Sequence, residues 1–175
     1  MQAPAARETA TLPDSAADAS NDFNSRIMEE FRANEGRVGG PLAGTPILLL
    51  HHIGAKSGIK RVTPLACSPK GDGHYVIVAS NAGSPTHPGW YYNLKAHPTV
   101  EVEVGTETFM VRAEELEGAA RDALWSKLVA ASRALTKYQA KTARQIPMLM
   151  LTRADPANTA GTDTHFPDVP TSEQL

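Results

Sequence analysis

The segment GAKSGIKR places three basic residues around a Ser-Gly pair. The cations are Lys56, Lys60 and Arg61, and they flank Ser57 and Gly58. The segment lies between two strand-like runs, so we expect a strand, a turn and a second strand, with the cations gathered at the turn. Basic side chains and freed backbone N–H groups at such a turn suit an anionic group. The alternative is three solvated surface charges, which spacing alone does not exclude.

A second candidate site is the segment ASNAGSPTHPGWYYN, residues 79–93, which combines small residues, prolines and aromatic residues. Pro88 suits the first position of a helix, whose free N–H groups would point into the preceding loop. A helix start of this kind favours a phosphate or a polarised carbonyl. Small residues such as Ala79 and Ser80 would let a flat ligand approach the backbone. The alternative is a core role, which we expect for at least two of Trp90, Tyr91 and Leu94.

Other chemistries are poorly supported by the residue types and spacings. His51 and His52 are neighbours on an expected strand, where adjacent side chains point to opposite faces, so we predict no metal site. Cys67 is the single cysteine and has no internal disulfide partner, and its strand-like surroundings favour a packed thiol. The chain has no G-x-S-x-G elbow that would indicate a hydrolytic nucleophile.

Composition excludes some partners. The 175 residues carry 17 Lys or Arg and 19 Asp or Glu, a formal net charge of -2, so we predict no nucleic-acid partner. The longest apolar run is ILLL at residues 47–50, far shorter than the roughly 20 residues of a spanning helix. We expect a cytoplasmic protein without stable membrane insertion. Monomer and homodimer both stay open.

Composition also predicts the domain boundaries. Residues 1–20 are rich in Ala, Ser, Thr and Asp, and residues 154–175 in Pro, Thr and Asp, so we predict a disordered N-terminal arm and a disordered C-terminal tail. Phe23, Ile27 and Phe31 recur at helical spacing and predict an amphipathic helix from Asn21. The predicted folded, cofactor-binding domain is therefore residues 21–153.

Within this domain the pattern alternates between short strands and helices. Pro64 would remove one ladder donor, which favours an edge strand or a bulge, and KGDG at residues 70–73 predicts a hairpin. A helix is expected after the third strand and another over residues 118–143. We predict an α+β fold, with about six mainly antiparallel strands in a small barrel. The expected strands cover residues 45–53, 60–69, 74–80, 99–104, 107–116 and 146–151.

Three blocks resemble one protein family in sequence, order and spacing: GAKSGIKRVTPL, YVIVASNAGSPTHPGWYYNLKAHPTVEVEVGTETF and IPMLML. They resemble the deazaflavin-dependent nitroreductase and quinone reductase family of actinobacteria, whose members use coenzyme F420. The resemblance runs from about residue 45 to 153. It implies a split β-barrel of the FMN-binding type and an oxidoreductase that transfers a hydride from reduced F420 to a quinone, an enone or a nitro compound.

The resemblance also implies where the cofactor lies. F420 joins a flat deazaflavin ring to an anionic chain of a phosphodiester and several glutamates. The resemblance assigns the chain to the basic turn: Lys56, Ser57, Lys60 and Arg61. It assigns the ring to ten further residues: Val62, Thr63, Pro64, Ala79, Ser80, Asn81, Pro88, Gly89, Trp90 and Asn93. Because reduced deazaflavin is itself the hydride donor, we expect little acid–base machinery.

One residue is a candidate for the substrate side. Tyr138, in KYQAKT, resembles a family position in the substrate pocket, and its hydroxyl could deliver a proton to the reduced acceptor. A purely structural role is the alternative for this tyrosine. Two other classes of protein also stay open: an FMN-dependent split-barrel oxidoreductase, and a protein that binds deazaflavin or a hydrophobic ligand without turnover.

The chain departs from the family pattern at three places. Asn81 stands where some members have a lysine, which would weaken one contact with the anionic part of the cofactor. Ala134 and Leu135 stand where others have aromatic residues, so we do not expect activation of a particular nitroaromatic drug. His51 and His52 stand where threonines are common.

Overall fold

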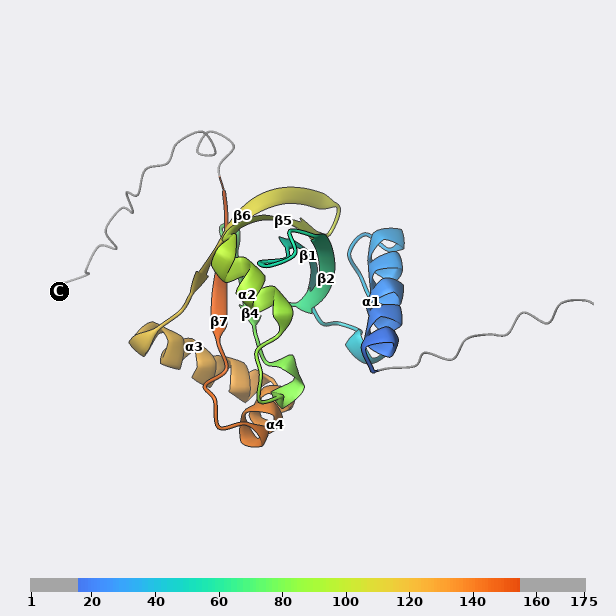
Figure 1. The fold of residues 1–175 in the computed structure, drawn as a ribbon. Helices are drawn as coiled ribbons and strands as arrows, with labels where there is room; N and C mark the ends of the chain where they lie inside the picture. Colours follow the sequence, from blue (N-terminus) through green and yellow to red (C-terminus); the bar gives the residue numbers. More distant parts are fainter. Residues whose placement is uncertain (1–15, 155–175) are drawn as a thin grey trace, which may run out of the picture.

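The computed structural model describes residues 16–154. Within them, seven strands form one antiparallel sheet in the order β2-β1-β5-β6-β7-β4-β3. The sheet curls until β2 and β4 approach each other (Figure 1), so the predicted α+β barrel is confirmed, with seven strands in place of about six. The strands are β1 (Ile47–Ile53), β2 (Lys60–Ala66), β3 (Ser68–Gly71), β4 (His74–Val78), β5 (Thr99–Val104), β6 (Glu107–Glu115) and β7 (Met148–Arg153).

Helices flank this barrel at two places. Helix α1 packs beside β2 on the outside, whereas α3 and α4 lie together at the end away from the β5–β6 turn (Figure 1). The helix predicted over residues 118–143 is in fact two helices, because Ser132 has an extended backbone (φ -135°). The described helices are α1 (Ala16–Ala33), α2 (Gly89–Ala96), α3 (Gly118–Ala131) and α4 (Arg133–Lys141), with short 3-10 helices η1 (Gly40–Leu42) and η2 (Asn81–Gly83).

The additional strand comes from KRVTPLACSP, which the sequence predicted as one strand. Its first part, β2, pairs with β1, and its second part, β3, pairs with β4. Between them the N–H of Cys67 donates to the carbonyl of Pro46 at 2.9 Å. An extended segment that changes partners needs no Gly or Pro break, so residue pattern alone did not reveal the change. Strand β2 is an edge strand, as Pro64 predicted.

Two apolar clusters stabilise the fold, one on each face of β1. Leu48 and Leu50 belong to the cluster inside the barrel. Ile47 and Leu49 belong to a second cluster, which α1 covers with Phe31 and its neighbours. Because successive side chains on a strand point to opposite faces, a strand covered on both sides is apolar throughout. This explains the run ILLL.

The turns agree with the sequence better than the element ends do. The predicted turns at GAKSG and KGDG both connect antiparallel neighbours. At KGDG, Asp72 and Gly73 both have positive φ (53° and 76°), as a two-residue hairpin turn requires. Strand β7 begins two residues later than predicted, at Met148. Helix α2 begins at Gly89, with Pro88 as its cap and not its first residue.

Helix α1 corrects another predicted boundary. It begins at Ala16, five residues before the predicted start at Asn21, so the end of the predicted arm is helical. Alanine has the highest helix propensity, and the segment before Asn21 contains three alanines at positions 16–19. The rest of the predicted arm, and all of the tail but Ala154, lie outside the described residues. Within residues 16–154, no helix is both long and apolar enough to cross a membrane.

Replacing Phe31 with Ala should lower the free energy of unfolding by about 3–5 kcal/mol, because this side chain is only 1% exposed and its loss leaves a cavity. Urea denaturation measures the change. The matched control is Phe23→Ala in the same helix, where the side chain is 51% exposed, and it should change the stability by about 0.5 kcal/mol at most. Equal losses in the two variants would contradict the packing described for α1.

Candidate functional site

The basic turn joins β1 to the edge strand β2. The N–H of Gly54 donates to the carbonyl of Ile59, and the N–H of Gly58 donates to the carbonyl of Gly54, both at 2.9 Å. Gly58 has a φ of 67°, which glycine adopts without steric cost. These bonds fix the turn and leave Lys56 and Ser57 exposed at its tip. The Ser57 hydroxyl also accepts a hydrogen bond from the N–H of Ile59 at 3.2 Å.

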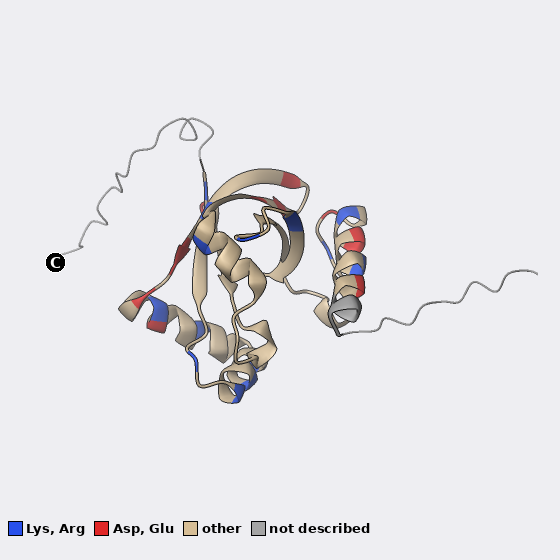
Figure 2. Ribbon diagram, viewed as in Figure 1, with Lys and Arg blue, Asp and Glu red and all other residues tan. Residues whose placement is uncertain are grey.

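The charges around this turn favour an anionic ligand. Asp72 is the only acidic residue in the segment 36–100, which contains six Lys or Arg residues. Within residues 16–154, the exposed Lys56, Lys60 and Arg61 form no ion pair with a carboxylate. Figure 2 shows acidic residues mainly on α1 and along β5 and β6. Cations without carboxylate neighbours keep their attraction for an anion.

A hydrogen-bonded chain connects the turn to helix α2. The N–H of Ala55 donates to Oδ1 of Asn93 at 2.9 Å. Nδ2 of Asn93 lies 2.8 Å from Nδ1 of His52, and Nε2 of His52 lies 2.9 Å from the hydroxyl oxygen of Thr63. The structure thus brings together the basic turn, β2 and α2, which the resemblance assigned to the two ends of one ligand.

The loop at residues 79–87 has an unusual backbone in its first half. Asn81 and Ala82 have φ values of 46° and 52°, in the left-handed region that costs a non-glycine residue roughly 1–2 kcal/mol. Gly83 follows with a φ of 79°, and a Cβ there would lie 2.8 Å from the carbonyl oxygen of Tyr138 on α4. The loop therefore keeps this conformation only if neighbouring elements hold it.

Arg144 is the residue that holds this loop. Its guanidinium donates to the carbonyl oxygens of Ser80 at 2.8 Å, Ser84 at 2.9 Å and Ala79 at 3.3 Å. It also donates to Nδ1 of His87 at 2.8 Å. Burial, together with the charge of Arg144, lowers the pKa of His87, so the imidazole accepts this bond in its neutral form. Arg144 was not predicted from the sequence, because it lies about 60 residues from the loop and in no motif.

The predicted ring residues fall into three groups by exposure. Ala79 and Trp90 are 0% and 7% exposed and lie in the barrel core, where Tyr91 and Leu94 join them, so the predicted core role of the α2 residues is confirmed. Asn81 and Gly89 are exposed. The remaining members are half-buried: Val62, Thr63, Pro64, Ser80, Pro88 and Asn93.

Two predicted residues lie apart from the group around Asn93. Val62 packs against the cluster under α1, on the face of β2 opposite Thr63. Tyr138 is half-buried on α4, and its backbone is the part that approaches Gly83. The described hydrogen bonds include none to the Tyr138 hydroxyl.

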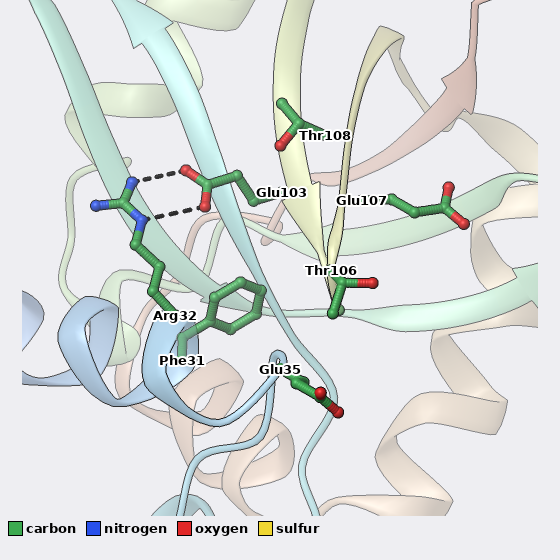
Figure 3. A pocket seen from close by; sticks show the side chains of 8 residues that line it. Phe31, Arg32, Glu35, Glu103, Thr106, Glu107 and Thr108 are labelled. Carbon is green, nitrogen blue, oxygen red and sulfur yellow. Dashed lines mark hydrogen bonds and ion pairs between the residues drawn. The ribbon is translucent and has the colours of Figure 1, made fainter.

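A pocket of about 260 Å³ lies elsewhere, between α1 and the β5–β6 hairpin. Figure 3 shows Arg32 reaching across it to Glu103, with Phe31 beside them. Its lining contains three glutamates and one arginine, and that arginine already pairs with Glu103 at 2.6 Å. Such a lining repels an anionic cofactor, and none of the predicted site residues contributes to it. We therefore place the candidate cofactor site at the basic turn and not here.

His51 belongs to this second region. Its Nε2 lies 2.8 Å from Glu103 and its Nδ1 lies 3.8 Å from Glu101, so His51 and His52 point to opposite faces as predicted. Hydrogen bonds from Arg32, assisted by the bond to His51, hold the pKa of Glu103 below its usual value. Within residues 16–154, no three His, Cys, Asp or Glu residues form a group that could hold a metal ion.

The curled antiparallel sheet of seven strands defines a protein of the split-barrel class. A family model described as F420H(2)-dependent quinone reductase matches residues 24–153. An F420H(2)-dependent quinone reductase of Mycobacterium tuberculosis is 44% identical over 128 residues, which cover 70% of this chain and 85% of that relative. This chain belongs to the F420H(2)-dependent quinone reductase family.

Two solved structures are also similar. One, titled an F420-H2 dependent reductase (FDR-A), is 44% identical with a TM-score of 0.54, and the match covers 61% of this chain and 93% of that one. The other, titled a domain-swapped dimer, is 39% identical with a TM-score of 0.56, and the match covers 78% and 99%. The fold of this chain is therefore the split β-barrel predicted from the sequence.

Family membership confirms the main functional predictions. The protein is an oxidoreductase, its cofactor is reduced coenzyme F420, and it transfers a hydride to a quinone-type acceptor. The mycobacterial relatives fit the predicted actinobacterial family. Membership favours F420 over the FMN alternative and an enzyme over a binding protein without turnover.

Replacing Arg144 with Ala should speed amide hydrogen exchange throughout residues 79–87, because three carbonyls and His87 lose their donor while the left-handed residues keep their strain. Exchange followed by mass spectrometry measures this in the cofactor-free protein. The matched control is Arg153→Ala, which removes a guanidinium whose pair with Glu107 is about half exposed. Unchanged exchange at residues 79–87 in Arg144→Ala would contradict the role of Arg144.

Replacing Glu103 with Gln should make stability less dependent on acid pH. The folded pKa of Glu103 lies below 4.5, so its ionised form contributes stability that is fully present above pH 4.5 and lost as the pH falls through the folded pKa. The free energy of unfolding of the wild type should therefore fall more steeply below about pH 4.5 than that of the variant. The matched control is Glu107→Gln, which removes an exposed carboxylate from the same hairpin. An equal change of slope in the two variants would contradict the role of Glu103.

Proposed function

We propose that reduced F420 binds across the basic turn, strand β2 and the start of helix α2. The single observation that carries this assignment is the hydrogen bond from Ala55 to Asn93, which joins the turn bearing the unpaired cations to α2. This bond supports the proposal because it brings the three cations of the turn close to the hydrogen-bonding groups of α2. A cofactor with an anionic chain on a polar flat ring needs both.

The residues of this region fit such a cofactor. Lys56, Lys60 and Arg61 would hold its phosphodiester and carboxylates, and their mutual repulsion without a carboxylate partner is relieved by an anion. Thr63 on β2 offers a hydroxyl on the same face of the sheet as His52 on β1. At the exposed start of α2, a Cβ added to Gly89 would meet no heavy atom within 4 Å, so a ligand can approach the backbone there.

The chemistry is divided between cofactor and protein. Reduced F420 supplies the hydride when bound. Arg144 fixes the loop at residues 79–87, which would hold one side of the ring in place. We propose Tyr138 as the residue that delivers a proton to the reduced acceptor, because α4 packs directly on this loop. Enones and nitro compounds are proposed as further acceptors beside quinones.

The assembly and location of the enzyme are also proposals. A solved structure 39% identical to this chain is titled a domain-swapped dimer, which supports a homodimer over a monomer. A cytoplasmic location and the lack of a nucleic-acid partner stay predictions from the sequence.

Replacing both Lys56 and Arg61 with Ala should weaken F420 binding by about 10- to 100-fold, since two charge-assisted contacts at an exposed turn are lost. Fluorescence titration measures the dissociation constant, and wild-type affinity should fall as salt is added. The matched control is Lys70→Ala, an exposed cation on the β3–β4 hairpin, which should bind as the wild type does. Equal affinity of the double variant and the wild type would refute the anion site.

A parallel titration with FMN tests the identity of the cofactor, and a turnover assay tests the reductase activity. Oxidation of reduced F420 on adding menadione is followed by absorbance. Tight FMN binding without F420 binding would refute the assignment of F420 as the cofactor. F420 binding without oxidation by any quinone or enone would refute the reductase activity.

A further inference from the structure

His52 is a buried polar residue among apolar neighbours. It continues the inward-facing row of Leu48 and Leu50 on β1, and it is only 5% exposed. Both of its ring nitrogens have partners, Asn93 on α2 and Thr63 on β2. The imidazole of His52 therefore connects α2 to β2 inside the barrel.

The series of hydrogen bonds from Ala55 through Asn93 and His52 to Thr63 has its direction fixed at the Ala55 end. A backbone N–H can only donate, so the atom of Asn93 that faces Ala55 must be the oxygen. The amide nitrogen of Asn93 therefore faces Nδ1 of His52 and donates to it. An amide nitrogen cannot accept a hydrogen bond, so Nδ1 must be the unprotonated ring nitrogen.

The same reasoning continues through the ring to Thr63. With Nδ1 as acceptor, the single proton of the neutral His52 lies on Nε2, which donates to the Thr63 hydroxyl oxygen. The Thr63 hydroxyl hydrogen must then point away from His52. Within residues 16–154, this hydroxyl has no other hydrogen-bond partner in the structure. It is left as a donor for a molecule outside the protein.

The neutral state of His52 has a structural cause. A second proton would place an N–H of His52 against the amide N–H groups of Asn93, and turning the amide would break the bond to Ala55. Burial, and next the charge of Arg61, lower the pKa of His52 in the same direction. Arg61 lies opposite His52 in the β1–β2 register. His51, on the other face of β1, adds a smaller effect.

We propose that His52 is a positioning residue that aims the Thr63 hydroxyl hydrogen at an acceptor atom, a carbonyl oxygen or ring nitrogen, of the bound deazaflavin. The inference rests on the proposed cofactor site, and it adds a residue that neither the motif nor the family pattern assigns. This series of hydrogen bonds, which we call the relay, starts at Ala55, next to Lys56. The turn that would hold the anionic chain of the cofactor therefore also determines where the Thr63 hydroxyl points beside the deazaflavin ring. A packing role for His52 alone would leave Thr63 free to rotate.

The proton position can be tested without cofactor. Nitrogen-15 NMR of the cofactor-free protein distinguishes the two neutral tautomers and the cation of His52. The relay requires the Nε2–H tautomer at pH 7, and it requires Asn93→Asp to change the His52 signals, because a carboxylate cannot donate to Nδ1. A proton on Nδ1 in the wild type would overturn the relay whatever the protein binds.

The ligand end is tested by F420 affinity. Thr63→Val should weaken binding by about tenfold, the value of one net hydrogen bond, while Thr63→Ser should bind within about threefold of the wild type. His52→Asn places an amide near the former position of Nδ1, but this shorter side chain cannot reach Thr63. It should therefore weaken F420 binding nearly as much as Thr63→Val does. The double variant His52→Asn/Thr63→Val should bind no more weakly than Thr63→Val alone.

A matched pair elsewhere in the sheet controls for general effects. His74 on β4 contacts the hydroxyl of Thr152 on β7 at 3.2 Å, so His74→Asn and Thr152→Val remove the same chemistry away from the site. Both should leave F420 affinity unchanged. Losses that add in the double variant, or an unchanged affinity in Thr63→Val, would overturn the inference while the proposed function stands. A wild-type protein that does not bind F420 would overturn both.

Discussion

Strand β1 is buried on both faces, and its side chains point alternately to the outer helix α1 and to the inside of the barrel. Its outward residues carry α1, and the row ends in His51, which joins the charged contacts that hold the helix. Its inward residues form the barrel core, and that row ends in His52, which contacts α2 and β2. A shift of one residue in the pairing of β1 would exchange the two rows and disrupt both sides at once.

Charge is separated along the same boundary. The span that contains the candidate site has one acidic residue in 65 positions, from residue 36 to 100. Glutamates gather on α1, β5 and β6, where Arg32 forms an ion pair with Glu103 and His51 contacts the same carboxylate. A protein with a slightly negative net charge can therefore attract an anionic cofactor, because the local field and not the total charge acts on it. Solvent and salt screen the distant carboxylates more than the adjacent cations.

Much of the fold could be predicted because local chemistry determines it. Positive φ at Asp72 and Gly73, and the missing donor at Pro64, act within a few residues, and both predictions were confirmed. The family blocks in the sequence also indicated the cofactor. The break at Ser132 and the change of partners at Cys67 could not be predicted, because each depends on what the chain packs against. Arg144 was missed for the same reason, since its partners are carbonyl groups about 60 residues away.

The way Arg144 holds its loop has a consequence for how the enzyme can change over evolution. Its partners in the loop are mainly main-chain carbonyls, which every amino acid carries. Side chains at positions 80 and 84 can therefore be exchanged without altering the path of the loop, as long as position 144 stays arginine and position 83 stays glycine. The sequence of this loop can therefore change while its shape, which is encoded outside it, is kept.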